Sequence, residues 1–422
     1  MWNGFVRLLS NLMRVRAGES RSDPMSTSAN EVALKDLLKA INEKKGNVAK
    51  LWQSLVARLN PHLADRSGAT AGTIEVGSKK LVMEVFRNSH YDYSVKGYGD
   101  RVAQSFGQIY LCLDYGREYV RQSKVANEVI QSITTEESFN LALEASLAAI
   151  ASLPSPGEFD IANLGEIAKK VLADICRVWF GLPDEISVVA GDYLCLDWTP
   201  PAQCPGHFIF PGNDMINPDP GNQITQLGQA QGQLLRKAVN DFVARRRAKL
   251  PGSIISGSLF REFPDPADND FLARTIVGIM VGFLPTVEWN LIYVVSGWWD
   301  VEFRKLQHEW QNARERDPYL RACEVLEKPL KQAMQKDPVP NAVWRTAIKQ
   351  HKLDGQNVNV GDKIAINIAT ATQEDLSKGV TDVFVMFGGD RHAKDHPTHA
   401  CPGYRAAMGV LLGSIAGLME AN

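Results

Sequence analysis

A cysteine directly before an apolar helix near the C-terminal end constrains this 422-residue chain more than any other feature. Cys401 is followed by Pro402, which has no backbone N–H to leave unpaired in the first turn of a helix. Residues 404–419 predict that helix by their composition. The positive end of a helix dipole favours a thiolate over a thiol, and the thiolate is the form that binds metals. Cys401 is therefore a candidate metal ligand.

Two other interpretations fit the local sequence. A lone cysteine before an apolar helix is most often a small buried hydrophobic side chain. A zinc site is the sharper alternative, because four potential ligands lie within ten residues: His392, His396, His399 and Cys401. Glycines also recur every four residues along the following helix, so one of its faces is nearly bare and a flat or bulky group could pack there.

The stretch at 387–403 resembles the cysteine-ligand loop of the cytochromes P450, F-G-x-G-x-H-x-C-x-G. The matching positions are Phe387, Gly388, Gly389, His399, Cys401 and Gly403. The chain departs from this motif by an insertion, because its phenylalanine lies fourteen residues before the cysteine, where the motif has seven. Plant allene oxide synthases and hydroperoxide lyases, P450 relatives that rearrange peroxides, also have a lengthened loop here. The resemblance implies haem b as cofactor, with Cys401 as its metal ligand and Phe387, His399 and Gly403 around it.

A long segment at 271–299 predicts a buried central helix, because it is apolar on nearly every side. Residues 268–270 read D-N-D and supply an N-cap. Pro285 lies inside this segment and removes an N–H that would bond to the carbonyl of Val281, so we expect a kink there. By itself this pattern also fits a kinked core helix without a catalytic role.

The middle of this segment resembles the A/G-G-x-D/E-T motif of the long P450 helix over the haem. Gly282 and Thr286 match this motif. Aligning the glycines places Leu284 at the acidic position and Pro285 at that of the first threonine, and neither can relay a proton. Asn290 lies one helical turn after Thr286, on the same face. We therefore expect Thr286 and Asn290 to orient a peroxide, while Gly282 and Pro285 complete the catalytic set. The alternative for Asn290 is that it caps the carbonyl that Pro285 leaves free or faces another helix.

The segment before the cysteine loop resembles the P450 order of elements. Residues 337–340 read D-P-V-P, Arg345 follows, and residues 361–375 form a G-D strand that ends in A-x-x-x-D. In the family an arginine at this place binds a haem propionate, and the forked donors of Arg345 suit a carboxylate. A surface arginine in a strand is the ordinary alternative. Because a zinc site does not explain this order of elements, we interpret the site as one for haem.

Two further features concern the cofactor. Where the P450s have E-x-x-R, this chain has Gln332-Ala-Met-Gln335, whose amides can hydrogen-bond but cannot form an ion pair. This departure puts standard haem insertion and electron transfer in doubt.

A helix upstream resembles the one whose basic residue reaches a propionate, with Arg117, Arg121 and Lys124 as candidates. We take Arg121 as the cofactor contact, and a solvated helix face is the alternative for each.

The composition is that of a soluble globular protein: 45% of residues are hydrophobic, 22% are charged, and the net charge is −2. The sequence has no excess of basic residues, so nothing in its charge indicates a nucleic-acid partner. The spacing of the six cysteines does not suggest a set of disulfide bonds, which indicates a reducing cytoplasm. The longest uncharged stretches of the central segment, 275–287 and 289–299, are shorter than the roughly 18–20 residues of a membrane span. We therefore expect no transmembrane span.

The chain has no linker, low-complexity tract or internal repeat, so we expect one domain. Residues 1–27 are expected to be a leader, disordered or amphipathic, with apolar residues at helical spacing that can contact a membrane surface. Residues 28–422 would then form a single-domain P450-like fold, mainly α with small β-sheets.

The resemblance and the altered central helix together predict a haem-thiolate oxidoreductase for a small apolar substrate such as a lipid. A peroxide or organic hydroperoxide is the expected oxidant, since it already carries both electrons and needs less proton relay. Two alternatives stay open. One is an O2-dependent monooxygenase supplied with electrons by a ferredoxin-type redox partner, and the other is a haem-binding or sensing protein without turnover.

Overall fold

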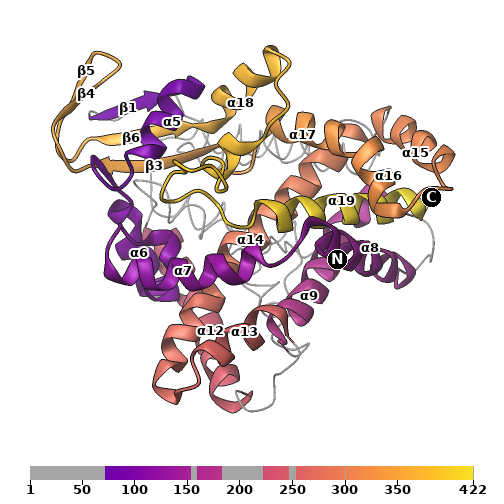
Figure 1. The fold of residues 1–422 in the computed structure, drawn as a ribbon, viewed down its shortest axis with the longest axis horizontal. Coiled ribbons are helices and arrows are strands. Elements are labelled where there is room, and N and C mark those ends of the chain that lie inside the picture. The colour runs from indigo at the N-terminus through magenta and orange to yellow at the C-terminus, as the bar shows by residue number, and fades with distance from the viewer. Residues whose placement is uncertain (1–71, 154–158, 183–221, 247–252, 300, 422) are drawn as a thin grey trace, which may run out of the picture.

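The computed structural model describes residues 72–153, 159–182, 222–246, 253–299 and 301–421. The leader expected at 1–27 and the first part of the expected domain, 28–71, lie outside these residues. The described part consists mostly of helices with two small β-sheets, which confirms the predicted fold class. Figure 1 shows the sheets at one corner, while helices form the rest of the molecule around the central helix α14 (Asn269–Trp298).

The larger sheet joins the start of the described chain to its C-terminal third. Its strands are β1 (Thr73–Val76), β6 (Lys363–Asn367), β3 (Ala342–Ala347) and β2 (Tyr93–Ser94), in this order across the sheet. β1 pairs parallel with β6, and the other pairs are antiparallel. The smaller sheet is a hairpin of β4 (His351–Leu353) and β5 (Gln356–Val358). Asp354 and Gly355 turn this hairpin with positive φ angles of 49° and 80°.

The described helices surround α14, and local sequence explains several of their starts. Ser78 accepts a hydrogen bond from the Leu81 N–H at the start of α5, and Thr134 forms a capping box with Glu137 at the start of α8. Besides α14, the helices are α5 (Lys79–Arg87), α6 (Lys96–Phe106), α7 (Arg117–Gln131), α8 (Thr135–Ala151), α9 (Leu164–Phe180), α12 (Asn222–Arg246), α13 (Ile254–Glu262), α15 (Glu302–Asn312), α16 (Pro318–Val325), α17 (Glu327–Lys336), α18 (Ile368–Ser377) and α19 (Tyr404–Glu420). Short 3-10 turns lie at Tyr110–Cys112, Ile161–Asn163, Pro266–Asp268 and Phe384–Phe387.

Helix α14 is the buried axis of the molecule, as its apolar sequence predicts, and it continues through Pro285. Among the described helices, Pro266–Trp298 is long and apolar enough to cross a bilayer, yet 67% of its most apolar window is buried inside the protein, as in a core helix. The N-cap of α14 lies within the predicted residues 268–270. Asp268 is the N-cap residue, but its side chain makes no capping bond and instead accepts a hydrogen bond from Arg121 at 2.9 Å.

The glycine face of α19 packs against helix α8. A Cβ on Gly409 would lie 2.2 Å from the carbonyl oxygen of Thr135, and one on Gly413 would lie 2.2 Å from that of Phe139. The group that packs against this bare face is therefore a neighbouring helix. Two helix backbones can approach this closely only where the side chains between them are small.

Gln335 replaces an ion pair with two amide hydrogen bonds. Its Nε2 donates to the carbonyls of Val380 and Asp382 at 2.9 and 2.8 Å, and the side chain is fully buried. The hydroxyl of Thr372 donates to the Gln335 carbonyl at 2.8 Å. These bonds connect α17 to α18 and to the segment before the cysteine loop, so the altered E-x-x-R position still joins these elements.

Candidate active site

The loop that carries Cys401 is closed by backbone contacts. The Cys401 N–H donates to the carbonyl of Phe387 at 2.7 Å, so the two ends of the sequence motif lie side by side. Gly388 and Gly389 have φ angles of 72° and 118°, which glycine adopts at little cost. A Cβ on Gly389 would also lie 2.7 Å from Cδ of Pro397. The inserted residues therefore fold back without separating the ends of the motif.

Cys401 lies just before helix α19, whose N-cap is Gly403. Pro402 therefore precedes the helix and does not occupy its first turn, which corrects the predicted placement. The Gly403 N–H donates to Sγ of Cys401 at 3.3 Å. Burial raises the pKa of the Cys401 thiol, whereas this N–H and the charge of Arg391 act to lower it. A thiol in such surroundings loses its proton when a metal cation binds it.

The residues near Cys401 do not form a zinc site. Within the described ranges, no group of three or more His, Cys, Asp or Glu side chains is placed to hold a metal ion. His396 turns toward the backbone, with its Nδ1 3.1 Å from the carbonyl of Pro397. His399 instead lines a cavity next to Cys401. The zinc alternative is not supported, because the described histidines and Cys401 do not form a group that could hold a metal ion.

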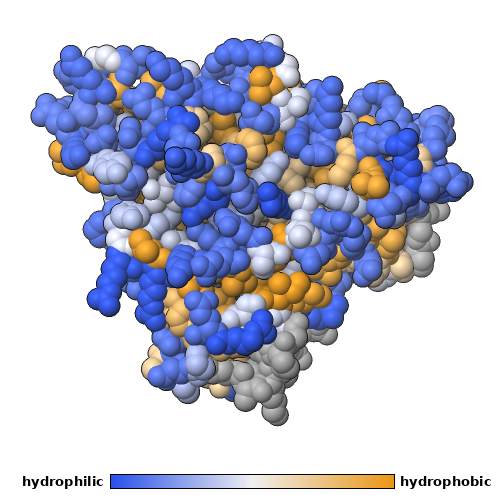
Figure 2. Space-filling view, viewed as in Figure 1, coloured by the Kyte–Doolittle hydropathy of each residue, from blue (hydrophilic) through white to orange (hydrophobic). Residues whose placement is uncertain are grey.

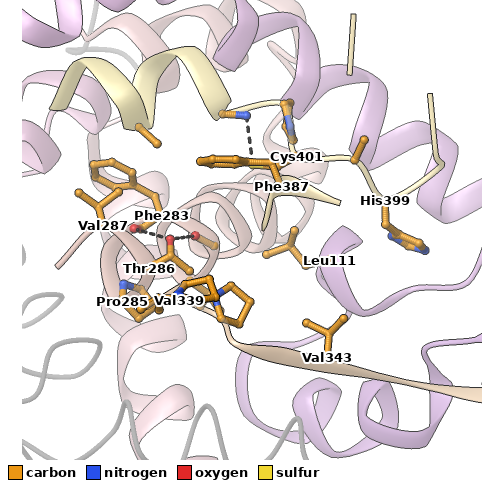
Figure 3. A pocket seen from close by; sticks show the side chains of 18 of the residues that line it. Leu111, Phe283, Pro285, Thr286, Val287, Val339, Val343, Phe387, His399 and Cys401 are labelled. Carbon is orange, nitrogen blue, oxygen red and sulfur yellow. Dashed lines mark hydrogen bonds between the residues drawn. The ribbon is translucent and has the colours of Figure 1, made fainter. Parts of the chain in front are cut away.

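A cavity of about 870 Å³ lies between the cysteine loop and α14. This volume is in the upper part of the range of roughly 300–1,000 Å³ found for small-molecule and cofactor sites. Figure 3 shows Thr286 and Pro285 of α14 on one side and Cys401 with its loop on the other. Most of the wall is apolar and includes Leu111, Ile130, Phe283, Val287, Val339, Val343, Phe387 and Ala406.

Arg345 and His399 supply buried polar atoms to this cavity. Arg345 lies on β3 and is 7% exposed; its Nη1 donates to the Trp344 carbonyl at 2.7 Å, while its buried Nε has no partner. Nε2 of His399 is likewise buried without a partner. Burial, followed by the charges of Arg345 and Arg391, lowers the pKa of His399 to about 3, so its imidazole is neutral. The cavity thus contains unpaired polar atoms that suit a ligand with acidic groups.

No protein-family model matches the sequence, and no curated protein matches it. Solved structures do match its shape. CalO2 superimposes with a TM-score of 0.59 at 15% identity, covering 82% of both chains. A mutant of P450 EryK in complex with erythromycin B has a TM-score of 0.57 at 16% identity, over 87% of this chain and 86% of its own. The cytochrome P450 enzyme CxnD, for C–S bond formation in chuangxinmycin biosynthesis, has a TM-score of 0.54 at 18% identity, over 81% and 78%.

The chain has the cytochrome P450 fold. The haem that this fold implies is compatible with the residues in the cavity. Sγ of Cys401 is a donor suited to iron. The unpaired Nε of Arg345 and Nε2 of His399 suit propionates, and the apolar walls suit a porphyrin. The predicted cofactor contacts Arg345, His399, Phe387 and Gly403 all line this cavity with Cys401.

Helix α14 supplies the wall of the cavity opposite the cysteine. Gly282, Pro285 and Thr286, the predicted catalytic residues of this helix, line the cavity. A Cβ on Gly282 would lie 3.0 Å from Cδ1 of Leu111, so glycine leaves room for that side chain. The hydroxyl of Thr286 donates to the carbonyls of Gly282 and Phe283 at 2.8 and 3.1 Å. Its hydrogen is therefore engaged within the helix, and only its oxygen is available as an acceptor.

Asn290 was predicted to face the cavity, but the structure places it elsewhere. It is absent from the described residues that line the cavity, and it is 4% exposed. Its Nδ2 donates to the carbonyls of Thr286 and Val339 at 2.7 and 3.2 Å. The shared helix face was inferred correctly, but the amide bridges α14 to the chain before β3. Asn290 therefore supports the wall of the cavity from behind Thr286 and Val339.

Arg121 is not placed to bind the cofactor. Its side chain is 46% exposed, pairs with Asp268 at 2.9 Å and stacks over the ring of Phe271 at 4.1 Å. Arg117 and Lys124 on the same helix are also exposed. The face on which α7 lies is mostly hydrophilic (Figure 2). The solvated helix face is thus the correct interpretation, because the basic side of α7 turns outward.

Arg391 is a cavity residue that sequence reasoning missed. It lies on the inserted part of the loop, lines the cavity, and donates to the carbonyls of Thr398 and Ala400 at 3.0 and 3.4 Å. Tyr98 and Tyr119 also line the cavity. The signal for Arg391 was its place two residues after Gly389, inside the motif. The insertion hid it, because inserted residues ordinarily lie on the surface.

Proposed function

We propose that this protein is a haem-thiolate oxidoreductase in which Cys401 is the axial ligand of the iron. The observation that carries the proposal is one cavity that contains the Cys401 thiol together with the unpaired Arg345 Nε and His399 Nε2. A thiolate-ligated haem, once bound, supplies chemistry that favours O–O bond cleavage. The protein contributes the ligand, the propionate contacts and a dry apolar wall.

The residues of α14 support a peroxide or an organic hydroperoxide as the oxidant. Leu284 and Pro285 carry no group that can move a proton, and the Thr286 hydrogen is held by backbone carbonyls. None of the described α14 residues that line the cavity is acidic, so a relay that delivers two protons to dioxygen has no acid there. A hydroperoxide arrives with both electrons and a proton, and the Thr286 oxygen can accept a hydrogen bond from it.

Aromatic rings support an apolar substrate. Two pairs of aromatic rings line the cavity. The ring centroids of Trp179 and Phe283 are 4.8 Å apart, and those of Trp289 and Tyr293 are 5.1 Å apart. Such surfaces bind flat or aliphatic groups by dispersion and by exclusion of water. The substrate class is therefore a small apolar molecule, for which a fatty-acid derivative is the first to test.

Absorption spectra test the cofactor assignment. The purified chain should bind haem, and its reduced carbonyl complex should show the red-shifted Soret band of a thiolate ligand. Cys401→Ala should lose that band. Cys112→Ala is the matched control, because Cys112 is the other thiol among the described residues that line the cavity, and burial raises its pKa to about 12. A protein that binds stoichiometric zinc and no haem, or that loses the band only with Cys112→Ala, contradicts the proposal.

A two-arm assay tests the oxidant. Apolar substrates are supplied either with hydrogen peroxide or a fatty-acid hydroperoxide, or with NAD(P)H plus a surrogate ferredoxin and its reductase. The peroxide arm should turn over, and Thr286→Ala should slow it at constant haem content. Turnover confined to the reductant arm would assign the O2-dependent alternative. A haem-loaded protein that is silent in both arms would favour a sensor.

A further inference from the structure

A pair of tyrosines spans the wall between the cavity and solvent. Tyr119 on α7 lines the cavity and is 6% exposed. Its ring centroid lies 5.0 Å from that of His399 and 6.0 Å from that of Tyr115. Tyr115, directly before α7, is 58% exposed. These spacings are those of aromatic neighbours in contact, so the two phenols form a continuous path from the cavity to the surface.

A second exposed tyrosine lies close by but is reached only through an imidazole. The ring of His90 is 5.3 Å from Tyr115 and 3.8 Å from Tyr91. Nδ1 of His90 lies 2.9 Å from the hydroxyl of Thr398, which fixes the ring in place. Imidazole is harder to oxidise by one electron than phenol. Tyr91 is also 58% exposed, so it offers a control that matches Tyr115 in exposure but is separated from Tyr119.

The two phenols differ in what can accept their protons. The Tyr119 hydroxyl donates to the carbonyl of Thr398, which is not a base, and burial raises the pKa of Tyr119. An electron can leave Tyr119 only briefly, because the carbonyl that accepts its hydrogen bond is not a base and does not take up the proton. Tyr115 faces water and can release its proton. An electron vacancy that enters at Tyr119 is therefore stabilised at Tyr115.

We propose that Tyr119 and Tyr115 carry oxidising equivalents out of the cavity, so that the protein also oxidises small phenols at its surface. This proposal rests on the proposed haem and peroxide function. One electron passes from Tyr115 through Tyr119 to the cavity, and the Tyr115 proton goes to water. A phenol in solution then gives one electron and one proton and restores Tyr115. Two phenols reduce one hydroperoxide to an alcohol and water and leave as two phenoxyl radicals.

The experiment uses the haem-loaded full chain without an apolar substrate. Hydrogen peroxide is added with a nitroso spin trap, peroxide consumption is followed, and trap adducts are located by peptide mass spectrometry. We expect the adduct on Tyr115 and little on Tyr91. Tyr115→Phe should remove it and slow the oxidation of guaiacol severalfold, whereas Tyr91→Phe should change neither. Tyr119→Phe keeps the ring but should lower the Tyr115 adduct, because phenylalanine is harder to oxidise.

The outcomes separate this proposal from the function on which it rests. A chain that binds no haem, or a haem-loaded chain that consumes no peroxide, overturns the proposed function and this route with it. A haem-loaded chain that consumes peroxide but labels Tyr91 and Tyr115 equally overturns the route alone. The same conclusion follows if Tyr119→Phe leaves the Tyr115 adduct unchanged. Circular dichroism verifies the fold of each variant, and each exchange removes only one hydroxyl.

Discussion

Alanine at position 413 tests the close backbone contact that places α19 beneath the cavity. A Cβ there would lie 2.2 Å from the carbonyl oxygen of Phe139 and 3.0 Å from Cβ of Ala142. The oxygen belongs to the backbone of α8, so the two helices must separate. Overpacking of this kind costs about 1–3 kcal/mol, and the better helix propensity of alanine returns at most about 1 kcal/mol. For Gly413→Ala we expect a net loss of about 1–2 kcal/mol in the free energy of unfolding.

Thermal unfolding followed by circular dichroism measures this effect. With an unfolding entropy of about 2 cal/mol/K per residue, a chain of 422 residues changes its Tm by about 1 °C per kcal/mol, so Gly413→Ala should lower Tm by about 1–2 °C. Gly165→Ala on α9 is the matched control, because nothing lies within 4 Å of a Cβ there. It should raise stability by about 0.4–1 kcal/mol. If both variants shift Tm in the same direction and by the same amount, the contact inferred between α19 and α8 is refuted.

Two further predictions concern charged side chains. Arg345→Ala should weaken haem retention about tenfold or more, since a charged hydrogen bond contributes roughly 1.5–3 kcal/mol; transfer of haem to apomyoglobin measures this, and unchanged retention contradicts the propionate contact. Burial lowers the pKa of Lys79, but its hydrogen bond to Asp375 and the charges of Asp382 and Asp375 outweigh it and raise this pKa above 10.5. The resulting stability is present below pH 10.5 and is lost as the pH rises through the folded-state value, so Lys79→Met should flatten the alkaline limb of the unfolding free energy, as chemical denaturation at graded pH measures.

Much of the fold and part of the candidate site can be predicted from the sequence. Local backbone requirements determine the Cys401 motif, the glycines beside Phe387 and the helix that follows. These features can therefore be predicted from the sequence alone. The apolar run of α14 predicts a buried helix because no side of it suits water. The order of elements around Arg345 also predicted that this arginine would line the cavity with the cysteine.

Only the tertiary structure decided which way each helical face turns. Asn290 shares a face with Thr286, yet its amide meets the Val339 carbonyl, and the basic side of α7 that carries Arg121 meets water. Periodicity defines the faces of a helix but not the partner of each face, which depends on residues distant in sequence. The sequence also did not determine the path of the inserted loop. For this reason the zinc alternative could not be excluded and Arg391 was missed. The path of an inserted loop is set by what it packs against, and its own residues do not specify that partner.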